Sequence, residues 1–151
     1  MKARIDQPAF AVPGAMDALQ ALGKAVADTG LSPVLIELLC LRASQINGCS
    51  VCVYGHCRAL RDLGESDDRL NGVSAWREMP FYTDAERAAL ELCEATTRLN
   101  DRADAVSDET WNAAANHFDA MQLAALVLAI ANINLWNRLN AATRQPAGAT
   151  W

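Results

Sequence analysis

The sequence has few lysines, no long apolar run and no segment of alternating β-branched residues. Only two of its 13 basic residues are lysines, the arginines are spread singly along the chain, and the formal net charge is −5. Without a stripe of basic side chains, the chain has nothing to neutralise a row of phosphates or of anionic lipid headgroups. We therefore expect no nucleic-acid partner and no membrane partner.

Signals for export or membrane insertion are also lacking. The first 14 residues carry charges on both sides of a short apolar part, without the apolar centre of a signal peptide. The longest apolar run, Leu123 to Ala131, is too short to span a bilayer. We therefore predict a cytoplasmic protein. An odd number of cysteines, five, argues against a secreted disulfide framework and favours metal binding or redox catalysis.

The length and the apolar pattern predict the fold class. A chain of 151 residues has the size of one ordinary domain, so we predict a single domain over residues 1–151, with residues 145–151 as a flexible tail. Apolar residues recur every three or four positions, and alanine and leucine dominate. This pattern predicts an all-α protein of about six to eight helices.

Capping residues and glycines set the expected helix boundaries. Gly30 is expected to end the first helix with a positive φ, and Ser32 and Ser107 are expected N-caps. Thr83 and Asp119 each precede a Glu or Gln by three residues, which is the spacing of a capping box. The expected helices run from Met16 to Thr29, Pro33 to Ile46, Gly48 or Cys49 to Gly64, Asp67 to Trp76, Thr83 to Leu99, briefly after Ser107, and from Asp119 to Arg144.

The chemically distinctive residues lie on the second and third of these helices. The connection Asn47-Gly48 is short, so the two helices are expected to be antiparallel neighbours. Cys49, Cys52 and His56 are spaced i, i+3 and i+7, which places them on one helix face. Glu37 lies about 15 Å before the turn, and His56 lies about 10 to 12 Å after it. We therefore expect the Glu37 and His56 side chains to approach each other.

These residue types suit thiol redox chemistry. A cysteine in the first turn of a helix faces unpaired N–H groups, which favour the reactive thiolate. Two cysteines on one turn can also form a disulfide, so an oxidised sulfur on one is resolved by the other. Glu37 has apolar neighbours on both sides, so its carboxylate is expected to be buried and to act as a base, with His56 as the proton shuttle. The predicted catalytic residues are therefore Cys49, Cys52, His56 and Glu37.

Two other interpretations stay open at the level of the residues alone. The cysteine pair also fits two small core residues, and a zinc site is possible from Cys49, Cys52, His56 and Cys57. Four ligands on one rigid helix, however, close a tetrahedron poorly. Cys40 and Cys93 are expected to be small buried residues.

The stretch from Glu37 to Gly64 resembles the core motif of the carboxymuconolactone decarboxylase superfamily, in its alkylhydroperoxidase AhpD-like branch. The residues that carry this resemblance are Glu37, Asn47, Cys49, Cys52, His56 and Gly64, and INLWNRLNAATR from Ile133 is similar to the closing helix of short members. The resemblance implies an AhpD-like helical bundle, with the motif on an antiparallel helix pair, that assembles into homotrimers or homohexamers.

The resemblance also implies a thiol-dependent peroxidase or disulfide reductase. The cysteine matching Cys52 would attack the peroxide after deprotonation by Glu37 and His56, and Cys49 would be the more exposed resolving partner in a cycling Cys49–Cys52 disulfide. No bound cofactor is expected. The substrate would be a hydroperoxide or a disulfide, and the reductant an external dithiol such as a lipoyl or thioredoxin-type protein. AhpD has a histidine where this chain has Val51, so the relay is expected to be shorter here.

The alternatives to this function are a decarboxylase or isomerase of the type that names the superfamily, which works without the cysteine pair, and a zinc-stapled structural oligomer. Oligomer formation is also expected from composition, since 52% of the residues are hydrophobic and only 21% are charged. The expected interface lies on the last helix, at Leu126, Ile130, Ile133 and Trp136.

Overall fold

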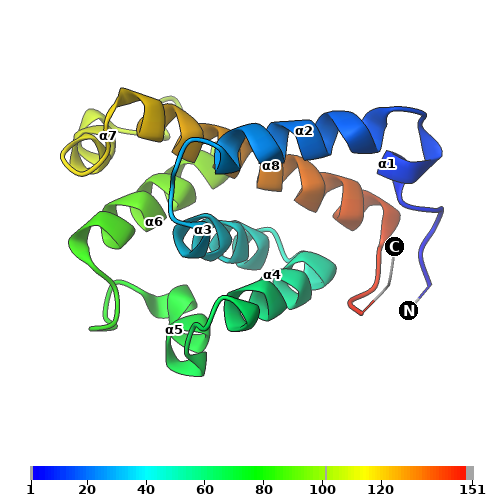
Figure 1. The fold of residues 1–151 in the computed structure, drawn as a ribbon, viewed down its shortest axis with the longest axis horizontal. Coiled ribbons are helices and arrows are strands. Elements are labelled where there is room, and N and C mark those ends of the chain that lie inside the picture. The colour runs from blue at the N-terminus through cyan, green and yellow to red at the C-terminus, as the bar shows by residue number, and fades with distance from the viewer. Residues whose placement is uncertain (1, 101, 149–151) are drawn as a thin grey trace.

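The computed structural model describes residues 2–100 and 102–148, which form eight α-helices and one 3-10 helix with no strand among them (Figure 1). The prediction of an all-α protein is therefore confirmed. The elements are α1 (Pro8–Ala11), α2 (Ala15–Ala27), α3 (Pro33–Ile46), α4 (Ser50–Asp62), α5 (Asp67–Gly72), η1 (Val73–Ala75), α6 (Asp84–Thr97), α7 (Asp108–Ala115) and α8 (Ala120–Thr143).

Four helices begin where side-chain caps were predicted. The hydroxyls of Ser32 and Ser107 accept hydrogen bonds from backbone N–H groups in the first turns of α3 and α7. Thr83 and Asp119 form complete capping boxes at the starts of α6 and α8. Gly30 has φ 81°, as expected for the residue that follows the end of α2.

Two segments differ from the predicted helices. The helix α1 was not predicted, because it is a single turn of four residues capped by Gln7 rather than by a serine, threonine or aspartate. The helix predicted from Asp67 to Trp76 is divided into α5 and η1. At the division, a Cβ on Gly72 would lie only 3.2 Å from Cγ of Met79, so the glycine allows close packing there.

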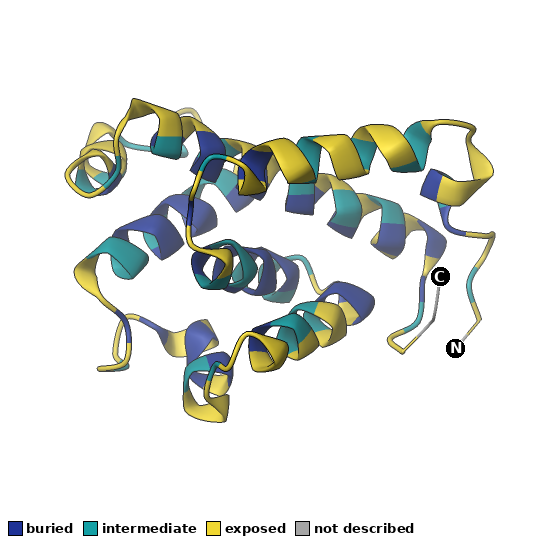
Figure 2. Cartoon of the chain, viewed as in Figure 1, coloured by how far each residue is buried: buried dark blue, intermediate teal, exposed yellow. Residues whose placement is uncertain are grey.

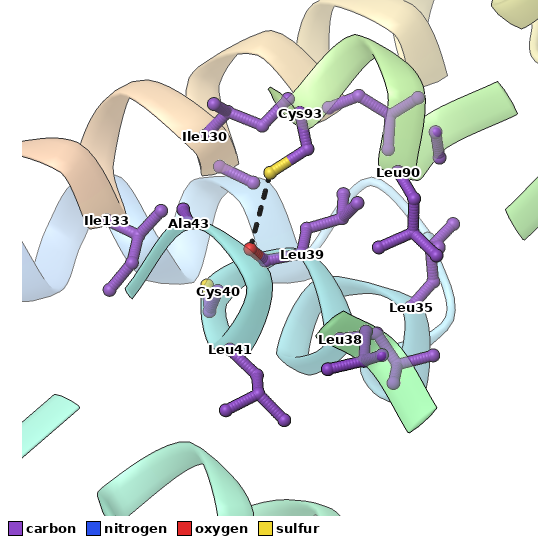
Figure 3. Packing of buried hydrophobic residues seen from close by; sticks show 14 of the residues in the cluster. Leu35, Leu38, Leu39, Cys40, Leu41, Ala43, Leu90, Cys93, Ile130 and Ile133 are labelled. Atoms are coloured by element: carbon purple, nitrogen blue, oxygen red, sulfur yellow. Dashed lines mark hydrogen bonds between the residues drawn. The ribbon is translucent and has the colours of Figure 1, made fainter. Parts of the chain in front are cut away.

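The helix α3 is the centre of the bundle and packs against α4, α6 and α8. Seven of its 14 residues are buried (dark blue in Figure 2). Residues 38–41 are consecutive and all buried, so α3 is covered on more than one side. Figure 3 shows these side chains packing against Leu90 of α6 and Ile130 and Ile133 of α8. Each fully buried leucine contributes roughly 1.5–3 kcal/mol, so α3 is a firm support for the side chains that it carries.

Cys40 and Cys93 are buried in this core, as predicted. The Sγ of Cys93 donates a hydrogen bond to the carbonyl oxygen of Leu39 at 3.4 Å (Figure 3). Burial raises the pKa of the Cys93 thiol to about 12 and raises the pKa of Cys40 well above its ordinary value. Both are therefore neutral thiols, which are poor nucleophiles.

The apolar run from Leu123 to Ala131 lies within α8, a helix of 24 residues. By length and composition alone, α8 could cross a membrane, since an 18-residue window has a mean hydropathy of 1.4. In the bundle, 44% of that window is buried, and the core helix of a water-soluble fold meets the same criterion. Its second half also carries buried asparagines, at positions 134, 137 and 140, that bond to other parts of the chain.

The α8 residues expected at an oligomer interface lie mainly in the core of their own chain. Leu126 and Ile130 are fully buried, and Ile133 is only 4% exposed. The apolar pattern identified residues that need covering, but α2, α3 and α6 already cover them. The exposed large apolar side chains of α8 are instead Met121, Leu128 and Leu135, spaced seven residues apart. Assembly into a trimer or hexamer stays a prediction.

The N-terminal residues run beside the end of α8. The backbone N–H of Arg4 donates to the carbonyl of Thr143 at 2.8 Å, and the side-chain amide of Gln145 donates to the carbonyl of Ile5 at 3.1 Å. The tail expected over residues 145–151 thus begins at a buried, hydrogen-bonded glutamine. Residues 149–151 lie outside the described part of the chain.

A buried carboxylate, Glu94 of α6, ties three parts of the bundle together. One oxygen accepts hydrogen bonds from Arg42 of α3 at 2.6 Å and from the Trp76 indole at 3.0 Å. The other accepts from Arg77 at 2.9 Å and Arg98 at 2.7 Å. Burial alone would raise the pKa of Glu94, but the hydrogen bonds from these four side chains outweigh burial and lower its pKa to about 2.

Because the folded state lowers the pKa of Glu94 from 4.5 to about 2, its contribution to stability is complete above pH 4.5 and is lost as the pH falls towards 2. At pH 7, Glu94→Gln is expected to destabilise the fold by about 3 kcal/mol, since Arg42 loses its buried partner. The difference from the unmodified protein should shrink below pH 4.5. Urea unfolding over pH 2–7 measures both effects.

The matched control is Glu91→Gln on the same helix, because that carboxylate is 46% exposed and meets Arg77 only at 3.6 Å. This variant should change stability by less than about 1 kcal/mol. Equal losses in both variants would show that the buried network does not stabilise the fold.

Candidate active site

The turn between α3 and α4 places two cysteines at the mouth of a helix. Gly48 has φ 67°, a left-handed conformation that turns the chain directly after Asn47. Cys49 is the N-cap residue of α4, and its N–H donates to the carbonyl of Ser44 at 3.0 Å. Cys52 therefore lies in the first turn of α4, where backbone N–H groups are unpaired.

Cys49 and Cys52 form a disulfide, with their Cα atoms 5.3 Å apart. The expectation that Cys49 is the more exposed of the two is wrong for this disulfide state, since Cys49 is 3% exposed and Cys52 is 8% exposed. The reason is the hydrogen bond from Cys49 to Ser44, which draws the N-cap residue under the end of α3.

Glu37 and His56 meet between α3 and α4, with Oε2 and Nδ1 2.7 Å apart. The ionised carboxylate only accepts hydrogen bonds, so Nδ1 carries the proton and Nε2 is the nitrogen that can accept one. The expectation of a buried carboxylate is wrong, since the Glu37 side chain is 25% exposed. Although its sequence neighbours are apolar, Glu37 itself lines a cavity of about 570 Å³ with residues of α2 and the end of α4.

Cys52 and His56 share a different cavity, of about 390 Å³. The two residues are one helical turn apart on α4, so both side chains reach the same space. The remaining lining comes from α1, α2, α4 and α8 and is mainly apolar: Phe10, Met16, Gln20, Val51, Gly55, Ile133, Trp136 and Asn140. Such a lining suits a small organic molecule with an apolar part.

An asparagine from the far end of the chain contacts the reactive pair. Asn140 Nδ2 of α8 donates to the Sγ of Cys52 at 3.2 Å. The Oδ1 of Asn140 accepts from Gln7 Nε2 at 2.6 Å, and Gln7 Oε1 accepts from the backbone N–H of Ala9 at 3.1 Å. A backbone N–H can only donate, so it fixes the orientation of the Gln7 amide and, through it, that of Asn140. The N–H group of Asn140 therefore faces the sulfur, and after reduction of the disulfide it would stabilise a Cys52 thiolate.

Two further asparagines of α8 hold the turn itself. Asn47 Nδ2 donates to the Oδ1 atoms of Asn134 at 2.9 Å and Asn137 at 2.8 Å. Asn137 Nδ2 in turn donates to the hydroxyl of Ser44 at 3.0 Å. These hydrogen bonds fix the α3–α4 turn against α8, so the position of the cysteine pair relative to Asn140 is fixed as well.

The predicted site residues are thus brought together, while Gln7 and Asn140 were not predicted. The signal for Asn140 was present, because asparagines at three-residue spacing in an apolar helix are unusual and favour a polar contact in the core. Cys57 is half-buried, and burial raises its pKa. In the part of the chain that the structure describes, no three His, Cys, Asp or Glu side chains are grouped to hold a metal ion.

Comparisons with known proteins show which proteins this chain resembles. The model of the carboxymuconolactone decarboxylase family matches residues 13–95. The uncharacterized protein YdfG of Bacillus subtilis is 35% identical over 130 residues, which cover 86% of this chain and 87% of YdfG.

Two solved structures share the fold. A protein of unknown function from Agrobacterium tumefaciens, suggested to be an antioxidant defence protein AhpD, has a TM-score of 0.90 at 36% identity and covers 99% of this chain and 100% of its own. The debrominase Bmp8 has a TM-score of 0.78 at 22% identity, covering 91% of this chain and 73% of its own, which shows a likeness of fold alone.

The contact between Asn140 and Cys52 predicts how fast the reduced Cys52 thiol reacts. Asn140→Leu removes the donor at nearly constant volume, so alkylation of Cys52 by iodoacetamide at neutral pH should slow by about five- to tenfold. Gln7→Glu should act in the same direction, because a carboxylate cannot donate to Asn140. Mass spectrometry of the Cys52 peptide over time gives the rates. Asn132→Leu is the control, since Asn132 is a half-buried asparagine of α8 that takes no part in the contacts to Cys52 or to the α3–α4 turn. An Asn140→Leu rate equal to the rate of this control would contradict the assignment.

Proposed function

The chain belongs to the carboxymuconolactone decarboxylase family, and we propose that it is a thiol-dependent reductase of hydroperoxides or disulfides, of the AhpD-like type. One observation carries the proposal: Cys52, half of a cysteine pair, lines the same apolar cavity as His56, which is bonded to Glu37. A nucleophile, its resolving partner and a proton acceptor are thus together beside a space for an organic substrate.

The first step is attack of the Cys52 thiolate on the terminal oxygen of a hydroperoxide in the cavity. The O–O bond breaks, the sulfur becomes a sulfenic acid, and the alkoxide leaves as an alcohol after taking a proton. His56 Nε2 accepts the thiol proton before the attack and returns a proton to the leaving oxygen. Asn140 stabilises the thiolate by its hydrogen bond to Sγ.

Glu37 stabilises the protonated form of His56 during this step. Its carboxylate accepts a hydrogen bond from the Nδ1–H group, with nitrogen and oxygen 2.7 Å apart, and therefore holds the imidazole ring in one orientation. Glu37 also lines the cavity of about 570 Å³ that does not contain Cys52. We infer that it connects His56 to the solvent through this cavity. Protons can be exchanged with water there without opening the substrate cavity.

The second step regenerates the pair. The Cys49 thiol attacks the sulfenic acid on Cys52, a disulfide forms, and water leaves. An external dithiol then reduces the Cys49–Cys52 disulfide by thiol–disulfide exchange and becomes a disulfide itself. No bound cofactor takes part in this cycle. We place the cycle in the cytoplasm, where dithiol reductants are kept reduced.

The cysteine pair is tested by mixing fully reduced protein with one equivalent of cumene hydroperoxide. The count of free thiols should fall from five per chain to three, and peptide mapping should find a Cys49–Cys52 bridge that a dithiol reverses. Cys52→Ser should abolish turnover. Cys57→Ser, on the same helix but outside the pair, should keep it.

If the thiol count does not change and the peroxide is not consumed, the peroxidase hypothesis is wrong. Reduction of disulfide substrates would then be the activity left to test. Turnover of a cyclic acid that survives loss of both cysteines would instead favour a decarboxylase or isomerase.

The proton relay predicts a change in pH dependence. Glu37→Gln keeps the shape of the side chain but removes its charge, so peroxide turnover near neutral pH should fall by about 10²-fold. Asp62→Asn is the control, because Asp62 is exposed and lines the same cavity of about 570 Å³ as Glu37. Stopped-flow rates from pH 5 to 9 make the comparison, and a pH–rate profile identical to that of the unmodified protein would remove Glu37 from the mechanism.

A further inference from the structure

The two cysteines of the disulfide line different cavities. Cys52 lines the apolar cavity described above, and Cys49 does not. Cys49 lines another cavity, of about 520 Å³, at the turn and the end of α8. Its other lining residues are Lys2, Gly48, Ser50, Asn140, Ala141, Arg144 and Gln145, and only Asn140 belongs to both cavities. The disulfide therefore stands between two spaces of different chemistry.

The cavity at Cys49 is cationic in an acidic protein. The formal net charge of the chain is −5, yet the charged lining residues are Lys2 and Arg144, with no carboxylate among them. Among the described residues, neither side chain takes part in a salt bridge. Two such charges beside a reactive sulfur raise the local concentration of an anionic reagent.

We propose that the cavity at Cys49 is the entry site of the reductant, and that the reductant is a slender anionic dithiol that attacks Cys49 from this side. Cys49 is only 3% exposed, so a folded protein surface cannot reach its sulfur, whereas a small molecule can enter the cavity. The inference rests on the redox cycle proposed above. It adds a separate site for the second reactant of that cycle.

The direction of attack decides which cysteine is released. The reductant thiolate bonds to the Sγ of Cys49, the Cys49–Cys52 bond breaks, and its electron pair goes to Cys52 as a thiolate. This thiolate is released into the apolar cavity, beside His56 and with the hydrogen bond from Asn140. The second thiol of the reductant then attacks the reductant's other sulfur, which is bonded to Cys49 in the mixed disulfide. Cys49 leaves as a thiolate that takes a proton from water, and the reductant departs as a disulfide.

The reverse choice would serve the cycle less well. Attack on Cys52 would bring an anion into a cavity whose lining is mainly apolar, and would release Cys49 outside that cavity. Attack on Cys49 regenerates the peroxide-reactive sulfur in place while the substrate cavity stays free. Peroxide and reductant therefore do not compete for the same space.

The test compares two dithiols that differ only in charge, dihydrolipoate and its neutral amide, dihydrolipoamide. The protein is first oxidised to the disulfide with diamide, a thiol-specific oxidant, so the result does not depend on peroxide turnover. At low salt, the carboxylate should reduce the disulfide about three- to tenfold faster than the amide. The preference should vanish at high salt, because exposed charges are then screened.

The variants assign the preference to the cavity. Lys2→Gln combined with Arg144→Gln should remove the preference for dihydrolipoate while leaving the rate with dihydrolipoamide unchanged, which also shows that the variant is folded. Arg58→Gln is the control, since it removes a positive charge from an exposed site on α4 that lines neither cavity. The anionic monothiol 3-mercaptopropionate should form a mixed disulfide with Cys49. Acid quenching followed by peptide mapping locates this mixed disulfide.

Three results would overturn the inference: equal rates with the two dithiols, a preference that persists in the double variant, or a mixed disulfide found on Cys52. If peroxide fails to oxidise the pair but diamide-oxidised protein still shows the preference and the Cys49 adduct, the peroxidase proposal fails and the reductant site stands.

Discussion

The site depends on the hydrogen bonds between the α3–α4 turn and the asparagines of α8. Asn47 bonds to Asn134 and Asn137, and Asn137 bonds back to Ser44, so the turn has one position along α8. Leaving one of these buried groups without a partner would cost about 1–3 kcal/mol. A shift of α8 along its axis would strain these contacts and would also move Asn140 away from Cys52. The same polar contacts that give the bundle a unique packing therefore position the donor to the sulfur.

The distribution of polar and apolar groups around the disulfide gives the two halves of the proposed cycle different surroundings. Cys52 and His56 line the apolar cavity, whereas Lys2 and Arg144 are charged residues that line the cavity at Cys49. An organic hydroperoxide is neutral and favours the first environment, while an anionic thiol favours the second. Separation of the two reactants then follows from solvation and charge, without any movement of the bundle.

The parts of the structure that local rules control were predictable from the sequence. Helix periodicity and a short turn placed Glu37 beside His56, and caps such as Thr83 fixed helix starts. Contacts between distant segments were not predictable, and Gln7 bonds to Asn140 across 133 positions of the chain. Burial was predicted less well than spacing. Apolar neighbours do not show whether α2 covers Glu37, nor whether the chain itself already covers Ile130 of α8, because both depend on how whole helices pack.

The shorter relay expected for this chain corresponds to a feature of the cavity lining. Val51, in the position where AhpD has a histidine, is only 5% exposed and adds an apolar side chain to the lining. Among the described lining residues His56 is the one imidazole, so in the proposed reaction it would both accept the thiol proton and return a proton to the leaving oxygen. One group can do both only if it is held in a fixed orientation, which is what the Nδ1 contact with Glu37 provides. The partial exposure of Glu37 also suits the proposed proton relay. A fully buried carboxylate would have no path by which to exchange protons with water.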